Sequence, residues 1–221
     1  MKKLTLTPDQ ILATDDSVPD CDQLFKTYHR VFAGGEGESL PPIIVGTIKS
    51  PSEWIRRLQD GYSRWEQKHS DILRMRRKEY QILFSMLRKI PYYILDGNHR
   101  ALAAALNRRA LKVLQIDSDQ DLAEIERMIS GGQLLSFPHE GQSVEALEGE
   151  FIRHFLNLSD VPPNHNLNAT NVVEVVRLVP VATRAYDLVT SNKVPRYMVK
   201  NYSARKESRP RILPTPPIKW R

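Results

Sequence analysis

Residues 92–105, YYILDGNHRALAAA, join an apolar run to an alanine-rich run through an acid, a glycine and three polar residues. The apolar run predicts a buried strand over residues 92–95, and the alanines predict a helix over residues 98–109. Residues 111–116, LKVLQI, predict another strand directly afterwards. Strand, glycine turn, helix and strand in this order are typical of an α/β protein.

The start of this helix carries two basic residues in an unusual place. A helix N-terminus has about half a positive charge and disfavours cations, yet His99 and Arg100 stand there. One interpretation is that Asp96, at or near the cap, offsets them, or that water solvates both. The other is that an anion binds there, with Gly97 letting the backbone turn and Asn98, His99 and Arg100 donating to phosphate oxygens. The residues alone leave both interpretations open.

In the second interpretation Asp96 has a chemical role. A carboxylate at the end of a strand, beside a phosphate site, can hold Mg²⁺ or accept a proton from an attacking hydroxyl. It can also orient His99 through a hydrogen bond. The sequence therefore makes Asp96 the candidate metal ligand, and Asp96 and His99 candidate catalytic residues.

The rest of the chain predicts a mixed α/β fold with a helical insertion. Helices are predicted from hydrophobic periodicity and cap residues, and strands from short apolar runs. The predicted strands fall within residues 4–12, 40–48 and 171–181, and the predicted helices at 22–32, from Ser50, at 71–89, 121–130, 143–158 and 183–192. We expect a core over residues 1–117 with an insertion at 50–90, a helical and mixed part over 118–204, and a basic, proline-rich tail over 205–221.

Composition is that of a globular protein. Of 221 residues, 41% are hydrophobic and 26% charged, which fits one or two domains. The chain has no apolar run of membrane-spanning length, and its first residues, MKKLTLTPDQ, lack the apolar core of a secretion signal, so we expect a cytoplasmic protein with no membrane partner. A lone cysteine, Cys21, excludes an internal disulfide and is expected to be a packing residue.

Positive charge is concentrated in two segments. Residues 49–89 hold eleven basic residues against five acids, and residues 200–221 hold seven against one. Such segments attract nucleic acid or other anions, although a basic helix face is more often simply solvated. DNA contacts, if present, are expected from Arg74, Arg76, Arg77, Lys78 and the C-terminal tail.

Three segments together resemble a known superfamily. LTLTPDQIL, LPPIIV and YYILDGNHRALAAALNRRALKVLQI occur here in the order that is seen in the ParB/sulfiredoxin superfamily. The resemblance covers residues 4–117 and implies a small mixed sheet with flanking helices. It also implies that DGNHR, residues 96–100, grips nucleotide phosphates at the helix N-terminus. ATP or ADP with Mg²⁺, or CTP, are the cofactors that it implies.

Members of this superfamily differ in the residues of the motif. Sulfiredoxins place a catalytic cysteine where this chain has Asn98, and chromosome-partition ParB proteins carry Gly-Glu-Arg-Arg followed by a helix-turn-helix region. The motif is most similar to that of free-serine kinases, Asp-Gly-His-His-Arg, which differs at one position. These kinases use an acid after the first strand as catalytic base, and the resemblance gives this role to Asp9.

The sequence therefore favours a nucleotide-binding protein that acts as a Mg²⁺-dependent phosphotransferase on a small hydroxylated substrate such as free serine. The alternative is a DNA-associated ParB-like protein of a plasmid, phage or mobile element, with nucleotide-switched DNA binding or nuclease activity. A third interpretation is a scaffold that binds a phosphate-bearing ligand without turnover.

Overall fold

A mixed five-stranded sheet forms the centre of the protein. The structure, a computed structural model, describes residues 1–13, 23–68, 85, 87–134, 137–156, 180–190 and 194–199. The strands are β1 (Lys2–Leu6), β2 (Ile11–Leu12), β3 (Ile43–Thr47), β4 (Tyr92–Asp96) and β5 (Leu111–Ile116). They are ordered β1-β5-β3-β4-β2, with β3 parallel to β5 and antiparallel to β4. The predicted mixed α/β fold is confirmed.

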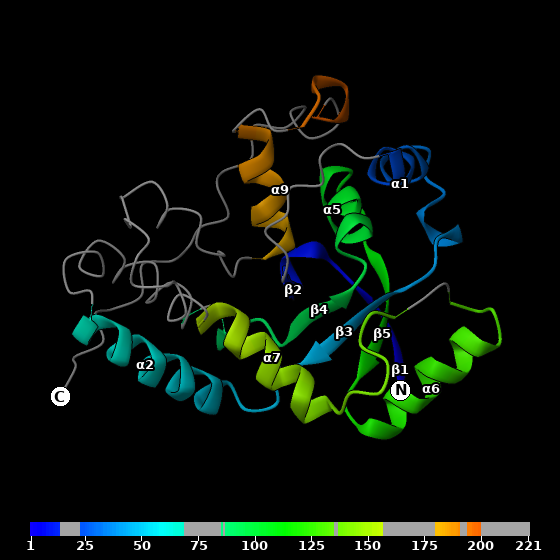
Figure 1. The fold of residues 1–221 in the computed structure, drawn as a ribbon. Coiled ribbons are helices and arrows are strands. Elements are labelled where there is room, and N and C mark those ends of the chain that lie inside the picture. The colour runs from blue at the N-terminus through cyan, green and yellow to red at the C-terminus, as the bar shows by residue number, and fades with distance from the viewer. Residues whose placement is uncertain are drawn as a thin grey trace.

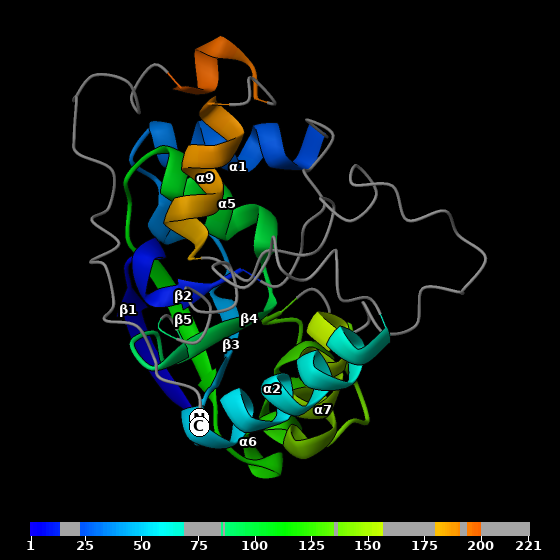
Figure 2. The same ribbon diagram turned by 90° about the vertical axis from the view of Figure 1, so that its left-hand side faces the viewer.

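Helices cover both faces of this sheet (Figures 1 and 2). On one face lie α1 (Gln23–Ala33), α5 (Asn98–Leu106) and α9 (Val181–Thr190), and on the other α2 (Pro51–Lys68), α6 (Asp119–Ser130) and α7 (Val144–Leu156). Because side chains alternate along a strand, Ile43 and Val45 of β3 enter the core under α5, whereas Ile44 between them enters the core under α6. The sheet therefore separates two hydrophobic cores.

Helix α5 is buried over most of its length. Its four alanines at 101 and 103–105 are all buried. Alanine has the highest helix propensity and its short side chain permits close approach of the backbone to neighbouring elements. Helices α1 and α9 pack on either side of α5 (Figure 1). The sheet, α1 and α9 together therefore hold α5 in position.

The buried stripe of α1 differs from the expected one. Spacing predicts Leu24, Phe25, Tyr28 and Phe32 on one packed face. Phe25 and Phe32 are buried and Tyr28 packs partly buried against the same core, but the third buried residue of the helix is His29 rather than Leu24. Leu24 is 51% exposed. His29 is buried, and its Nε2 lies 3.0 Å from the carbonyl oxygen of Met198, which satisfies the buried nitrogen. Burial lowers the pKa of His29.

The C-terminal part completes the core over α5. Val181, Ala185 and Leu188 of α9 are buried there, together with Val194 and Met198 around the short helix η4 (Arg196–Val199). Of the predicted strand over 171–181, residues 171–179 lie outside the described residues. Pro180 forms an isolated bridge with Leu12, and Val181 already begins α9.

Three aromatic rings form the contact between the sheet and the α2–α7 pair. Tyr93 lies 5.2 Å from Trp54 and 4.5 Å from Phe151 between ring centroids. The ring of Tyr93 lies over Gly46 of β3, where a Cβ atom would be 2.3 Å from its Cζ. Trp54 also donates a side-chain hydrogen bond to Glu148, whose pKa is raised by burial.

Several predicted features cannot be compared with the structure. Cys21, nearly all of the helix expected at 71–89, and the tail from residue 200 onwards lie outside the described residues. Among the described helices, none is both long enough and apolar enough to cross a membrane.

Candidate functional site

Gly97 makes the turn from β4 into α5. Its φ of 99° lies in the left-handed region, and its carbonyl accepts the first hydrogen bond of the helix from the Ala101 N–H at 2.9 Å. A Cβ atom at this position would lie 2.6 Å from Cγ2 of Ile43 and 3.0 Å from Nη2 of Arg100. Both the conformation and the close approach require glycine. The predicted sharp turn is confirmed.

Arg100 reaches back over this turn and is held at two points. Its Nη2 donates to Oδ2 of Asp96 at 2.8 Å, and its Nη1 donates to the carbonyl oxygen of Pro41 at 3.1 Å. The Arg100 side chain is 10% exposed and that of Asp96 is 30% exposed. Asp96 therefore offsets the positive charge of Arg100 at the helix N-terminus. The guanidinium is fixed in one orientation by the two contacts.

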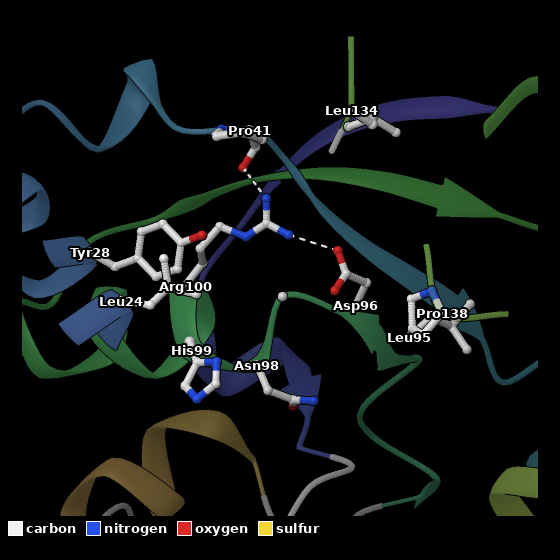
Figure 3. A pocket seen from close by; sticks show the side chains of 11 residues that line it. Leu24, Tyr28, Pro41, Leu95, Asp96, Asn98, His99, Arg100, Leu134 and Pro138 are labelled. Carbon is white, nitrogen blue, oxygen red and sulfur yellow. Dashed lines mark hydrogen bonds and ion pairs between the residues drawn. The ribbon is translucent and has the colours of Figure 1, made fainter. Parts of the chain in front are cut away.

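A pocket of about 320 Å³ opens in front of this ion pair (Figure 3). It is bounded by the end of β4, the first turn of α5, one face of α1 and the segment before α7. Its lining residues are Leu24, Tyr28, Pro41, Leu95, Asp96, Gly97, Asn98, His99, Arg100, Leu134 and Pro138. The size is at the lower end of the range for small-molecule sites. Five of the residues expected to form the site, 96–100, line it together.

The side chains of the motif do not all converge on one point. Asp96 and Arg100 face each other, whereas Asn98 and His99 point away from the Arg100 guanidinium (Figure 3). The ring of His99 lies 6.3 Å from that of Phe25, between centroids. A ligand in the pocket can therefore contact the ion pair on one side of the Gly97 turn and Asn98 and His99 on the other.

The structure does not bring Asp9 to this pocket. Asp9 lies in the short helix η1 (Pro8–Gln10), which leads into β2. Strand β2 is parallel to β4 with Ile11 opposite Tyr92. Asp96 lies four residues beyond Tyr92, about 13 Å along a strand. Asp9 therefore lies towards the opposite end of β4 from the pocket, and it is not a lining residue.

Asp96 is the lining residue with a carboxylate oxygen to offer a metal ion. Among the described residues there is no cluster of three or more His, Cys, Asp or Glu side chains that could hold a metal. Oδ2 of Asp96 accepts from Arg100, and its Oδ1 accepts no hydrogen bond within the described part of the chain. One carboxylate oxygen beside bound phosphates and water is a usual environment for Mg²⁺. Asp96 is the residue that would hold it.

Six lining residues were not identified as site residues from sequence: Leu24, Tyr28, Pro41, Leu95, Leu134 and Pro138. Pro41 contributes a backbone carbonyl, which any residue carries, so no sequence signal marks it. Leu24 and Tyr28 do carry a signal, because positions four apart share one face of a helix. The spacing predicts that this face packs on the core, whereas the structure turns it partly towards the pocket.

Comparison with family models, curated proteins and solved structures finds no match to this chain. The basic residues considered for DNA contacts, Arg74, Arg76, Arg77 and Lys78, lie outside the described residues, as does the C-terminal tail.

Proposed function

We propose that the protein binds a nucleotide with phosphates at the N-terminus of α5 and transfers a phosphate to a small hydroxylated molecule, with free serine as the first candidate. The observation that carries this proposal is the convergence of a helix N-terminus, a fixed arginine and a partly exposed carboxylate in one pocket. Amide N–H groups of a first helical turn and a guanidinium are the donors that phosphate oxygens prefer.

Arg100 is suited to phosphate because it is oriented before the ligand arrives. Two of its five N–H groups are used by Asp96 and Pro41. Its charge is neutralised by Asp96 in the free protein, so a bound phosphate shares the guanidinium with this carboxylate. Phosphoryl transfer depends chiefly on positioning and on stabilising charge on the transferred group. A guanidinium fixed from two sides supplies both.

Asp96 offers a single oxygen for chemistry. Because Oδ2 is used by Arg100, Oδ1 either holds Mg²⁺ or accepts the proton of the attacking hydroxyl. In the second case, the hydroxyl oxygen bonds to the terminal phosphorus, the bond to the leaving phosphate breaks, and the proton moves to Oδ1. Bound Mg²⁺ would neutralise phosphate charge. The two roles differ in an Asp96→Asn variant, which cannot accept the proton but retains an oxygen ligand.

Calorimetric titration with ATP, ADP and CTP in the presence of Mg²⁺ tests the binding step. We expect Arg100→Ala to weaken binding at least about tenfold, because a charge-assisted hydrogen bond contributes about 1.5–3 kcal/mol. His99→Ala, which does not remove a buried ion pair, is expected to weaken it about fivefold. Arg109→Ala, which removes an exposed arginine just after α5, is the matched control and should bind as the wild type.

The transfer step is tested by product analysis. Protein that binds ATP or ADP is incubated with Mg²⁺ and free serine or other small hydroxylated compounds, and phosphorylated product is measured by ³¹P NMR. Product that depends on Asp96 supports the proposal. Absence of nucleotide binding in the wild type contradicts it, and DNA affinity with its dependence on salt would then be measured for the alternative function.

A further inference from the structure

We infer that Leu24 and Tyr28 of α1 bind the base of the nucleotide, so that the protein selects nucleotides over bare polyphosphate with little discrimination between bases. This inference rests on the proposed function. It assigns the part of the ligand that the phosphate-binding residues do not contact.

The pocket has two apolar walls with a polar region between them. Leu24 and Tyr28 lie on one side of the Asp96–Arg100 pair, and Leu95, Leu134 and Pro138 lie on the other side (Figure 3). A ligand that carried only phosphate would leave both walls in contact with water. Ligand pockets of this kind combine apolar walls with a few polar groups, and the walls bind the apolar part of the ligand.

The wall on α1 is the one that carries an aromatic ring. Leu24 and Tyr28 are four residues apart and thus share one face of the helix. This face is adjacent to the buried stripe of Phe25, His29 and Phe32, which holds α1 against the core. The wall is therefore fixed, although Leu24 itself is 51% exposed. A tyrosine ring beside an exposed leucine, both on a helix held by its buried stripe, offers an apolar surface for a planar base.

This wall also limits how much the base can be recognised. Between them, the side chains of Leu24 and Tyr28 carry one polar group, the phenolic hydroxyl of Tyr28. Stacking on an aromatic ring tolerates every base because every base has a π-face. We therefore expect ATP and CTP to bind with affinities within about tenfold of each other.

The test compares ATP, CTP and inorganic tripolyphosphate, each with Mg²⁺, in calorimetric titrations. Three variants are used: Leu24→Ala, Tyr28→Leu, which keeps an apolar side chain and removes the ring, and Arg109→Ala as the control. Arg109 is exposed, lies just after α5 and does not line the pocket. We expect Tyr28→Leu to weaken ATP and CTP by about 5- to 100-fold and Leu24→Ala by a smaller factor. Tripolyphosphate binding and the control variant should be unchanged.

Two results would overturn the inference in different ways. If the wild type binds tripolyphosphate as tightly as ATP, and both α1 variants bind ATP normally, then α1 does not bind the base, while the proposed phosphate site stands. If neither ATP nor tripolyphosphate binds the wild type, the proposed function fails and the inference fails with it. An ATP preference over CTP of more than about a hundredfold would contradict stacking as the basis of recognition.

Discussion

Gly97 is required for the geometry of the site because it has no side chain. The residue has a φ of 99°, and the space where a Cβ would lie is occupied by Ile43 on one side and by Arg100 on the other. The same residue therefore sets the direction of α5 and lets the guanidinium pass over the turn to reach Asp96. The site depends on a backbone position rather than only on the charged side chains around it.

Replacing Gly97 with alanine should lower the free energy of unfolding through two effects, the strained backbone conformation and the lack of space for a Cβ atom. We expect Gly97→Ala to lower the free energy of unfolding by about 3 kcal/mol, from left-handed strain together with overpacking against Ile43. Gly35→Ala is the matched control, because Gly35 has a φ of 84° with nothing within 4 Å of its Cβ position. That variant should cost about 1–2 kcal/mol. Urea unfolding of both variants measures the difference, and equal losses would show that the space around Gly97 is not limiting.

Helices and strands can be predicted from the sequence where neighbouring residues alone determine them. The prediction of β5 over residues 111–116 agrees with the observed strand, and the helix predicted from Asn98 begins there. That helix ends at Leu106 rather than at residue 109, because Asn107 leaves the helical conformation and Arg108 turns to a φ of 54°. Neither Asn107 nor Arg108 is a glycine, the usual sequence signal for the end of a helix. The sequence pattern therefore predicts a helix that is too long.

Contacts between distant segments could not be predicted in the same way. His29 replaces Leu24 in the buried stripe of α1, and Met198, 169 residues away, supplies a carbonyl oxygen to its ring. Arg100 is fixed by the carbonyl of Pro41, 59 residues away. Backbone carbonyls have no signature in sequence. Residues 96–100, which line the pocket together, could therefore be predicted, whereas the other lining residues and the orientation of the side chains could not.

The packing between the sheet and the α2–α7 pair should be sensitive to added volume at Gly46. A Cβ atom there meets the Tyr93 ring, which is itself confined by Trp54 and Phe151. We expect Gly46→Ala to cost about 1–3 kcal/mol of stability in denaturant unfolding. Gly149→Ala on α7 is the contrasting variant. It has open space at its Cβ position and should gain up to about 1 kcal/mol from helix propensity. A loss of stability in Gly149→Ala as large as that in Gly46→Ala would contradict the role of the Tyr93 ring in limiting the space at Gly46.

Across the whole molecule, α1 connects the C-terminal segment to the pocket. Its inner face holds residues 194–199 through the contact between His29 and Met198, and its neighbouring face lines the pocket with Leu24 and Tyr28. A change that weakens the docking of η4 should therefore also disturb the α1 wall of the site. His29 is the residue through which pH can act on this connection.

Stability should decrease as the pH falls below the ordinary His29 pKa of 6.5. Because burial lowers the pKa of His29 in the folded protein, the unfolded chain binds the proton first, and stability is lost as pH falls from 6.5 through the folded pKa. Asp121, whose pKa is also lowered, loses its contribution only below 3.8. Thermal melting at a series of pH values should show a smaller decrease between pH 7 and pH 5 in His29→Gln. Parallel decreases in both proteins would exclude His29 as the cause.

The most direct measurement of the central claim is a titration of ¹⁵N-labelled protein with Mg²⁺ and a non-hydrolysable ATP analogue, followed by amide chemical shifts. Phosphate binding at the N-terminus of α5 predicts saturable shifts that are largest at the amides of Asn98, His99 and Arg100, with the Arg100 side-chain N–H groups shifting together with them. Saturable shifts confined to another part of the protein, or no shifts at millimolar analogue, would contradict the account.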